Sequence, residues 1–210
     1  SFLAALLTLT AVIVLLLIFF LISFDAQEKA QNVLGTAKVV PKCNLSAVCP
    51  SDRFAFKIWS GAANVVGPKI CFDGKNIMSH IMNNVGPGLN IVVVNAPKFL
   101  FSPNFNSISD SAVILAYLKE IKPGMIVLVA SFDDVATKMT DEIRQMFVAM
   151  GSTLIDSVKQ KDNWVFAGRM GIKIKSVFEQ VTESDKKTNV FEGWPERVEV
   201  GGCFPRTTSV

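Results

Sequence analysis

The first 24 residues of the chain form a predominantly apolar run that contains no charged side chain. As a helix that rises about 1.5 Å per residue, this run would reach roughly 36 Å, which exceeds the hydrocarbon core of a bilayer. The pattern therefore predicts a membrane-inserting segment at residues 1–24, either a signal peptide with small residues at Ser23 and Ala26 near its cleavage site or an uncleaved signal-anchor. In both cases the rest of the chain enters the secretory pathway.

After this run, the hydrophobic pattern switches between strand and helix periods. Phe54, Phe56 and Ile58 recur at every second position, which is typical of a half-buried strand, whereas the later strands are nearly continuous apolar runs. Strands are predicted at residues 54–60, 89–95, 125–131, 163–168 and 197–200, and helices at residues 109–119 and 140–151. The alternation over residues 89–168 by itself favours a parallel sheet of the α/β class.

A nucleotide-binding sheet would need a phosphate loop, and neither glycine-rich segment provides one. "GPKICFDGK" (67–75) has no Ser or Thr after its Gly-Lys pair, and "VGPGLN" (85–90) lacks the third glycine of a dinucleotide-binding motif. We interpret both segments as turns and predict no cofactor.

Charge and length define one domain. All 21 Lys and Arg and all 18 Asp and Glu follow residue 24, and the two signs are interspersed, so the net charge of +3 indicates no nucleic-acid partner. We assign residues 25–42 to a linker and residues 43–207 to a single domain. Membrane contact is expected only through residues 1–24, if they remain uncleaved.

Four cysteines, Cys43, Cys49, Cys71 and Cys203, carry the clearest chemical signal. No C-x-x-C motif is present and His80 is the single histidine, so we predict no metal site and, in an exported domain, two disulfides. Spacing leaves all three pairings open. Every pairing nevertheless contains one bond between the start and the end of the domain, worth about 5 kcal/mol on the chain-entropy model.

A glycosylation sequon adjoins the first cysteine. Asn44-Leu45-Ser46 has a permitted middle residue, so Asn44 is a predicted N-glycosylation site of the exported chain.

Few side chains suggest catalysis. Asp133 and Asp134 follow a predicted strand and could hold a cation or act as acid and base, but a turn and a helix cap are the favoured interpretation. His80 has no G-x-S-x-G segment to serve, so we predict no catalytic residue and no enzyme.

The tryptophans offer a different chemistry, because an indole face suits the apolar face of a sugar ring. Trp59 and Trp164 lie in strand patterns and are predicted to pack in the core, whereas Trp194 lies between Gly193 and Pro195 in a predicted turn. Trp194 with Asp133 and Asp134 is therefore the candidate ligand-binding surface. The alternative for Trp194 is a plug beneath the last strand.

Several sequence blocks, in order along the domain, resemble one known family. These blocks are "CPSDRFAFKIWSGAANVVGPKIC", "NNVGPGLNIVVVN", "VASFDDVATKMTDEIRQMF", "GS" at 151–152, "DNWVFAG", "FEQ" at 178–180 and "EGWPERVEVGGCFP". From Cys43 to Pro205 the chain is similar to the family with sequence similarity 3, whose domain resembles GG-type lectin modules.

The resemblance implies an α+β fold, a compact domain of two β-sheets lined by about three short helices, in place of the parallel sheet. It also implies disulfides between Cys43 and Cys71 and between Cys49 and Cys203. The chain departs from the family pattern at residues 101–112, where Asn106 stands in place of an expected Asp. A fifth cysteine is absent, so no disulfide-linked dimer is expected.

For function, the resemblance implies a secreted, cytokine-like signalling protein that acts through a cell-surface receptor. The alternative is a carbohydrate-binding module that recognises glycans or glycoproteins. The expected location is extracellular, with a type II membrane-anchored form in the Golgi or at the cell surface as the alternative.

Overall fold

The structure is a computed structural model that describes residues 10, 12–24, 26–27, 40–95, 100–102, 110–185, 187, 189 and 193–207. The chain divides into two units, Ser1–Val40 and Pro41–Val210. Much of the predicted linker at residues 25–42 and the segment around Asn106 lie outside the described residues.

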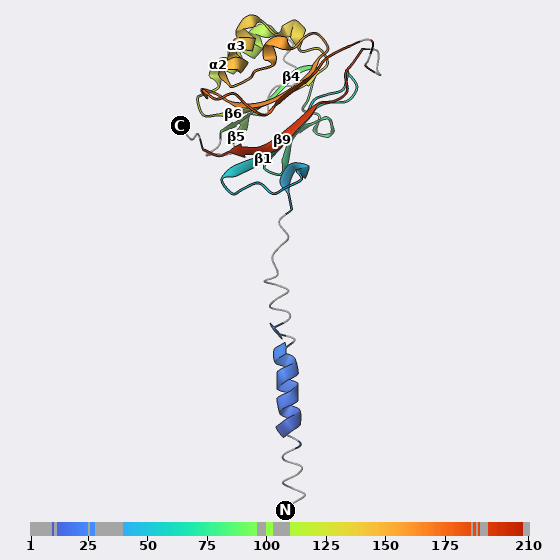
Figure 1. Ribbon diagram of the computed structural model, residues 1–210, viewed down its shortest axis with the longest axis vertical. Helices are drawn as coiled ribbons and strands as arrows, with labels where there is room; N and C mark the ends of the chain where they lie inside the picture. The colour runs from blue at the N-terminus through green and yellow to red at the C-terminus, as the bar shows by residue number, and fades with distance from the viewer. Residues whose placement is uncertain are drawn as a thin grey trace, which may run out of the picture. The chain divides into compact units, whose positions relative to one another are not determined.

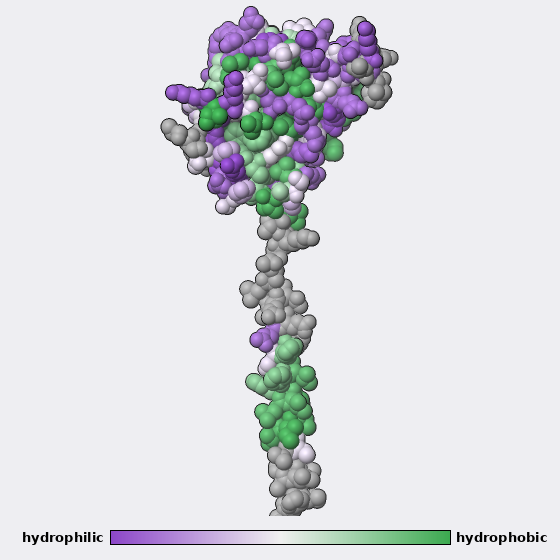
Figure 2. Space-filling model, viewed as in Figure 1, coloured by the Kyte–Doolittle hydropathy of each residue, from purple (hydrophilic) through white to green (hydrophobic). Residues whose placement is uncertain are grey.

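The first unit contains a helix over residues 12–24 whose large apolar side chains are exposed, as the hydrophobic surface of this segment in Figure 2 shows. Within the described residues, no helix combines the length and apolar character that crossing a bilayer requires. Residues 1–9 and 11 lie outside that description, so the predicted signal peptide or signal-anchor stays a prediction.

The second unit contains two β-sheets, and every strand pair in them is antiparallel. The four-stranded sheet has the order β3-β2-β1-β9, formed by Lys75–Ser79, Lys69–Phe72, Arg53–Trp59 and Glu199–Pro205. The five-stranded sheet has the order β5-β4-β6-β7-β8, formed by Leu100–Ser102, Gly88–Asn95, Ile126–Phe132, Asn163–Arg169 and Glu179–Thr182. The α+β class is confirmed, and the parallel sheet expected from the pattern alone is wrong.

Short helices lie on one side of the five-stranded sheet, opposite the layer that contains β1 and β9 (Figure 1). Helix α2 (Ser111–Glu120) begins after Asp110, whose carboxylate accepts the N–H of Ala112, and α3 (Asp141–Ala149) begins after Thr140, whose hydroxyl accepts the N–H of Ile143. The remaining helices are 3₁₀ segments: η1 (Lys42–Asn44), η2 (His80–Met82), η3 (Ala136–Lys138) and η4 (Ile155–Ser157). Helices α2, α3 and η4 contribute to the core on this side of the sheet.

Burial on both faces explains the continuous apolar strands. Alternate side chains of β4, β6 and β7 pack against the helices: Ile91, Val93, Val127, Val129, Trp164 and Phe166. Their neighbours pack against the inner face of the four-stranded sheet: Val92, Val94, Ile126, Leu128, Val165 and Ala167. An antiparallel sheet that is covered on both sides therefore has the apolar pattern that is typical of parallel sheets.

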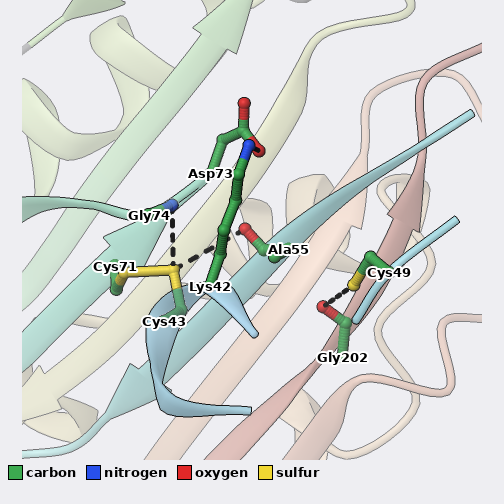
Figure 3. Close-up of a disulfide and its surroundings, with 8 residues drawn as sticks. All are labelled: Lys42, Cys43, Cys49, Ala55, Cys71, Asp73, Gly74 and Gly202. Atoms are coloured by element: carbon green, nitrogen blue, oxygen red, sulfur yellow. Dashed lines mark hydrogen bonds and ion pairs between the residues drawn. A yellow bond between two sulfur atoms is a disulfide. The ribbon is translucent and has the colours of Figure 1, made fainter. Parts of the chain in front are cut away.

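Both disulfides that the family resemblance implied are present. Cys43 is bonded to Cys71 of β2, with a Cα–Cα distance of 5.6 Å, and Cys49 to Cys203 of β9, at 5.5 Å. Figure 3 shows Cys43 and Cys71 beside the ion pair between Lys42 and Asp73, whose Nζ and Oδ1 atoms are 2.7 Å apart.

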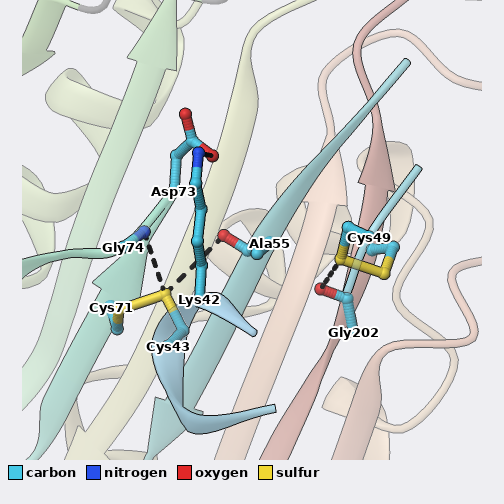
Figure 4. Close-up of polar contacts among 9 residues, drawn as sticks. Lys42, Cys43, Cys49, Ala55, Cys71, Asp73, Gly74 and Gly202 are labelled. Atoms are coloured by element: carbon cyan, nitrogen blue, oxygen red, sulfur yellow. Dashed lines mark hydrogen bonds and ion pairs between the residues drawn. A yellow bond between two sulfur atoms is a disulfide. The ribbon is translucent and has the colours of Figure 1, made fainter. Parts of the chain in front are cut away.

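Each disulfide also touches the backbone of the sheet. The N–H of Gly74 donates to the Sγ of Cys43 at 3.4 Å, and the Sγ of Cys49 lies 3.8 Å from the carbonyl oxygen of Gly202 (Figure 4). The segment from Cys43 to Cys49 is therefore held against strands on both sides of β1.

Candidate functional site

The side chains predicted to form a ligand surface lie at one end of the five-stranded sheet. Asp133 and Asp134 directly follow β6, and the antiparallel register places the end of β6 beside the start of β7 at Asn163. The side-chain amide of Asn163 donates to the carbonyl oxygens of Pro195 and Glu196, at 3.2 and 2.8 Å. These bonds hold the loop that contains Trp194 at the same end of the sheet.

Asp134 organises the turn that leads into η3. Its carboxylate accepts hydrogen bonds from the N–H groups of Ala136, at 3.0 Å, and Thr137, at 3.4 Å, and from the Thr137 hydroxyl. Burial by itself would raise the pKa of Asp134, but the hydrogen bonds from Thr137, Gln160 and Ala136 together hold that pKa below its usual value. Asp133 adopts a left-handed backbone conformation with φ 60°. This geometry is that of a turn and a cap.

Trp194 is half-buried, and the Nζ of Lys161 lies 5.0 Å from the centroid of its ring. Such a cation–π contact contributes about 0.5–1 kcal/mol at an exposed position. Lys161 follows Gln160, whose side chain hydrogen-bonds to Asp134. Two contacts, Lys161 with Trp194 and Gln160 with Asp134, thus link this end of the sheet, and we call Asp133, Asp134, Gln160, Lys161 and Trp194 the Trp194 end.

No metal centre is formed by the part of the chain that the structure describes, because no three His, Cys, Asp or Glu side chains come together there. His80 begins η2. The absence of metal and of catalytic residues stays a prediction from the sequence.

The two tryptophans that were predicted to pack in the core have different environments. Trp164 is fully buried, which confirms that prediction. For Trp59 the prediction is wrong: its side chain is half-buried, and the Nζ atoms of Lys57 and Lys69 lie 5.0 and 5.2 Å from its ring centroid. Because side chains alternate along a strand, Trp59 and the inward-facing Ile58 lie on opposite faces of β1.

A cluster around Glu179 is one that the sequence analysis missed. The Glu179 carboxylate accepts hydrogen bonds from the Ser152 hydroxyl, from the N–H and hydroxyl of Thr153 at 2.6 and 3.2 Å, from the N–H of Leu154 at 3.1 Å, and from the Trp164 indole at 2.9 Å. The carboxylate is therefore saturated with donors, and its role is structural.

The signal for this cluster was present in the sequence but divided among three blocks. "GS" at 151–152 provides a hydroxyl, "DNWVFAG" provides the indole, and "FEQ" at 178–180 provides the acceptor. Each block is uninformative alone, because the pairing of β7 with β8 brings Trp164 near Glu179, and the turn after α3 brings Ser152 to the same carboxylate.

Comparisons with known proteins match the sequence of this chain to several relatives. A family model described as interleukin-like EMT inducer matches residues 87–172, which include β4, β6, β7 and helices α2 and α3. Protein FAM3C of Homo sapiens is 44% identical over 213 residues, which cover 93% of this chain and 94% of that protein. Protein FAM3C of Danio rerio is 46% identical over 177 residues, 83% of this chain and 78% of that protein. Protein FAM3D of Homo sapiens is 47% identical over 167 residues, 78% of this chain and 75% of that protein.

Proposed function

This chain belongs to the FAM3 family, and from that premise we propose that it is a secreted, cytokine-like signalling protein that acts through a cell-surface receptor. The observation that carries the proposal is the match to Protein FAM3C, which extends over nearly the whole of both chains. The description of the family model as interleukin-like supports a cytokine-like role. The names of these relatives denote no enzyme, and we assign no catalytic role to the domain.

Three features support an extracellular location. Two disulfides tie the domain to its own first residues, and such bonds persist in oxidising compartments. Residues 1–24 have the pattern of an export signal. Asn44 and Ser46 of the sequon are exposed, so a glycan at Asn44 would meet no steric barrier from the described core.

The test is cell binding by the protein as it is secreted. We would express the full chain in mammalian cells, collect it from the medium, and measure its saturable binding to cells before and after mild protease treatment or enzymatic removal of surface glycans. If the receptor is a protein, protease treatment should abolish binding, and removal of surface glycans should leave binding intact. Retention of the chain inside cells, or binding that never saturates, would refute the proposal.

A second candidate function is carbohydrate recognition at the Trp194 end. The observation that favours it is a half-buried indole in contact with Lys161, whose chain neighbour Gln160 hydrogen-bonds to Asp134, since shallow polar sites with an aromatic face suit sugars.

Trp194→Ala separates this site from a structural plug, with Trp59→Ala as the matched control. If Trp194 binds the glycan, Trp194→Ala should lose glycan-array binding with an almost unchanged melting temperature. The control Trp59→Ala should keep binding. If Trp194 instead packs as a structural plug beneath the last strand, Trp194→Ala should lower the unfolding free energy by roughly 3 kcal/mol or more. A stable Trp194→Ala protein that still binds glycans would exclude this site.

A further inference from the structure

A cavity of about 500 Å³ lies at the end of β7 opposite to the Trp194 end. One wall is formed by residues 171–178, which connect β7 to β8, and another by Phe204 and Pro205 of β9. The volume falls within the range of sites that hold small molecules.

The lining combines apolar side chains with cations. Its apolar part consists of Met150, Ile172, Ile174, Val177, Phe178, Phe204 and Pro205. Its charged part consists of Arg169, Lys173 and Lys175, and no acidic side chain among the described residues lines it. The alternation Ile172-Lys173-Ile174-Lys175 places both kinds of side chain along one short segment.

The positive charge of this lining is not neutralised by the described protein. None of the ion pairs among the described residues includes Arg169, Lys173 or Lys175. Both lysines are exposed, whereas Arg169 is only 4% exposed and its Cζ lies 5.3 Å from the Phe204 ring centroid.

Hydrogen bonds to carbonyl groups hold the Arg169 guanidinium in the cavity wall. The guanidinium donates to the carbonyl oxygens of Gly124, at 3.3 Å, and Pro205. Burial lowers the pKa of Arg169, which reflects the cost of a desolvated charge without a counter-ion. An anion near this wall would reduce that cost.

We propose that this cavity binds a single-chain amphiphile with an anionic head group. The head group, a carboxylate or a phosphate, lies between Lys173 and Lys175 at the rim, and Arg169 adds to the positive potential there. The apolar tail packs against Phe178, Phe204 and the isoleucines, because that contact removes hydrocarbon from water. A sulfated sugar would satisfy the cations but would leave this apolar lining uncovered.

The test measures the binding of four probes to the full secreted chain by titration calorimetry and native mass spectrometry. Each probe is kept monomeric, below the concentration at which it forms micelles or other aggregates. Palmitate and palmitoyl lysophosphatidic acid carry the anionic head, and hexadecanol and palmitoyl lysophosphatidylcholine share the tail without a net negative charge. We expect one anionic molecule per chain, with the uncharged and zwitterionic probes roughly tenfold or more weaker. The better of the two anionic probes distinguishes a carboxylate from a phosphate ligand.

Charge-reversal variants locate the site. Lys173→Glu combined with Lys175→Glu should weaken anionic-probe binding by roughly tenfold or more. The control combines Lys75→Glu with Lys138→Glu, which changes net charge equally at exposed lysines outside the cavity and should leave affinity within about twofold.

Four results would overturn the proposal: no binding, equal binding of hexadecanol, equal loss in both double variants, or binding to anionic phospholipid vesicles alone. The last result would indicate a membrane-surface site instead. All four positions are exposed, so loss of folding is not expected to obscure the comparison.

Discussion

The two sheets of this domain are stabilised in different ways. The five-stranded sheet is buried between helices on one face and the other sheet on the opposite face, and neither disulfide joins its strands. The four-stranded sheet buries Phe54, Phe56 and Ile58 on its inner face alone. Its outer face is crossed by the segment from Cys43 to Cys49, which both disulfides hold in place. The four-stranded sheet, which has one apolar face, is therefore stabilised by disulfides on its other face. The five-stranded sheet is stabilised by packing on both faces.

The strand register explains how the outer face is divided. Cys71 pairs with Lys57 and Cys203 with Ala55, so both disulfides lie on the outward face of β1. Ala55 is 2% exposed and Cys71 3%, because the disulfide-linked segment covers this half. At the other end of β1, Trp59 lies among charged side chains and is half-buried.

The largest expected effect is loss of the bond that joins the ends of the domain. Replacing Cys49 and Cys203 together by Ala should lower the unfolding free energy by about 5 kcal/mol, because the bond closes a separation of 154 residues. Replacing Cys43 and Cys71, separated by 28 residues, should cost about 3.5 kcal/mol. Guanidinium unfolding without reductant measures both values, and the reverse order would contradict the assigned importance of the long loop.

The next effect contrasts a tryptophan from each sheet. Trp164→Ala should lower the unfolding free energy by about 3–5 kcal/mol, because it leaves a cavity in a layer that is buried on both faces. Trp59→Ala should cost roughly 1 kcal/mol, since it removes cation–π contacts at a half-exposed position. Thermal and chemical unfolding measure both variants. Equal losses of unfolding free energy in Trp164→Ala and Trp59→Ala would show that the outer face contributes as much packing as the central layer.

The third prediction concerns the hydrogen-bonded edge of the five-stranded sheet. Glu179→Gln should cost roughly 1–3 kcal/mol, because an amide nitrogen would face donors that now share a carboxylate. Glu183→Gln, at an exposed position after β8, is the control and should change stability little. A neutral Glu179→Gln variant would mean that water replaces these hydrogen bonds without loss.

The smallest effect tests the exposed charges of the four-stranded sheet. The hydrogen bond from Lys57 lowers the pKa of Glu199, and burial partly opposes this shift. The charge of Lys57, a hydrogen bond from the Trp59 indole and the charge of Arg197 lower this pKa further. A lowered folded-state pKa means that this stabilisation is present above the unfolded value of about 4.3 and is lost as the pH falls through the folded value.

Glu199→Gln should therefore make the decline of melting temperature between about pH 5 and pH 3 shallower. The change should stay below about 1 kcal/mol, because the Glu199 side chain is 52% exposed and the pair is screened by solvent. Glu120→Gln, at the exposed end of α2, is the control. An unchanged slope in the Glu199 variant would exclude a contribution from this pair.

Local features of the fold could be predicted from the sequence. The period of β1, the starts of the two helices near residues 110 and 140, and the presence of two disulfides depend on neighbouring residues or on cysteine chemistry. The disulfide pairing could not be predicted from spacing, and it required the family resemblance. The face of Trp59 was implied by the alternation that placed Ile58 inside, but the strand pattern as a whole was assigned to the core.

Tertiary structure decided the remaining features, because they depend on which distant segments pack together. Continuous apolar runs report burial on both faces and do not report strand direction, so the antiparallel order is set by pairing across the sheet. The Glu179 cluster is likewise formed from segments that are uninformative alone, and the cavity is completed only where the segment that follows Arg169 meets Phe204 and Pro205 of β9. The sequence by itself determined the local periods, the helix starts and the oxidised cysteines, whereas the packing of distant segments determined the direction of the strands, the Glu179 cluster and the shape of the surface.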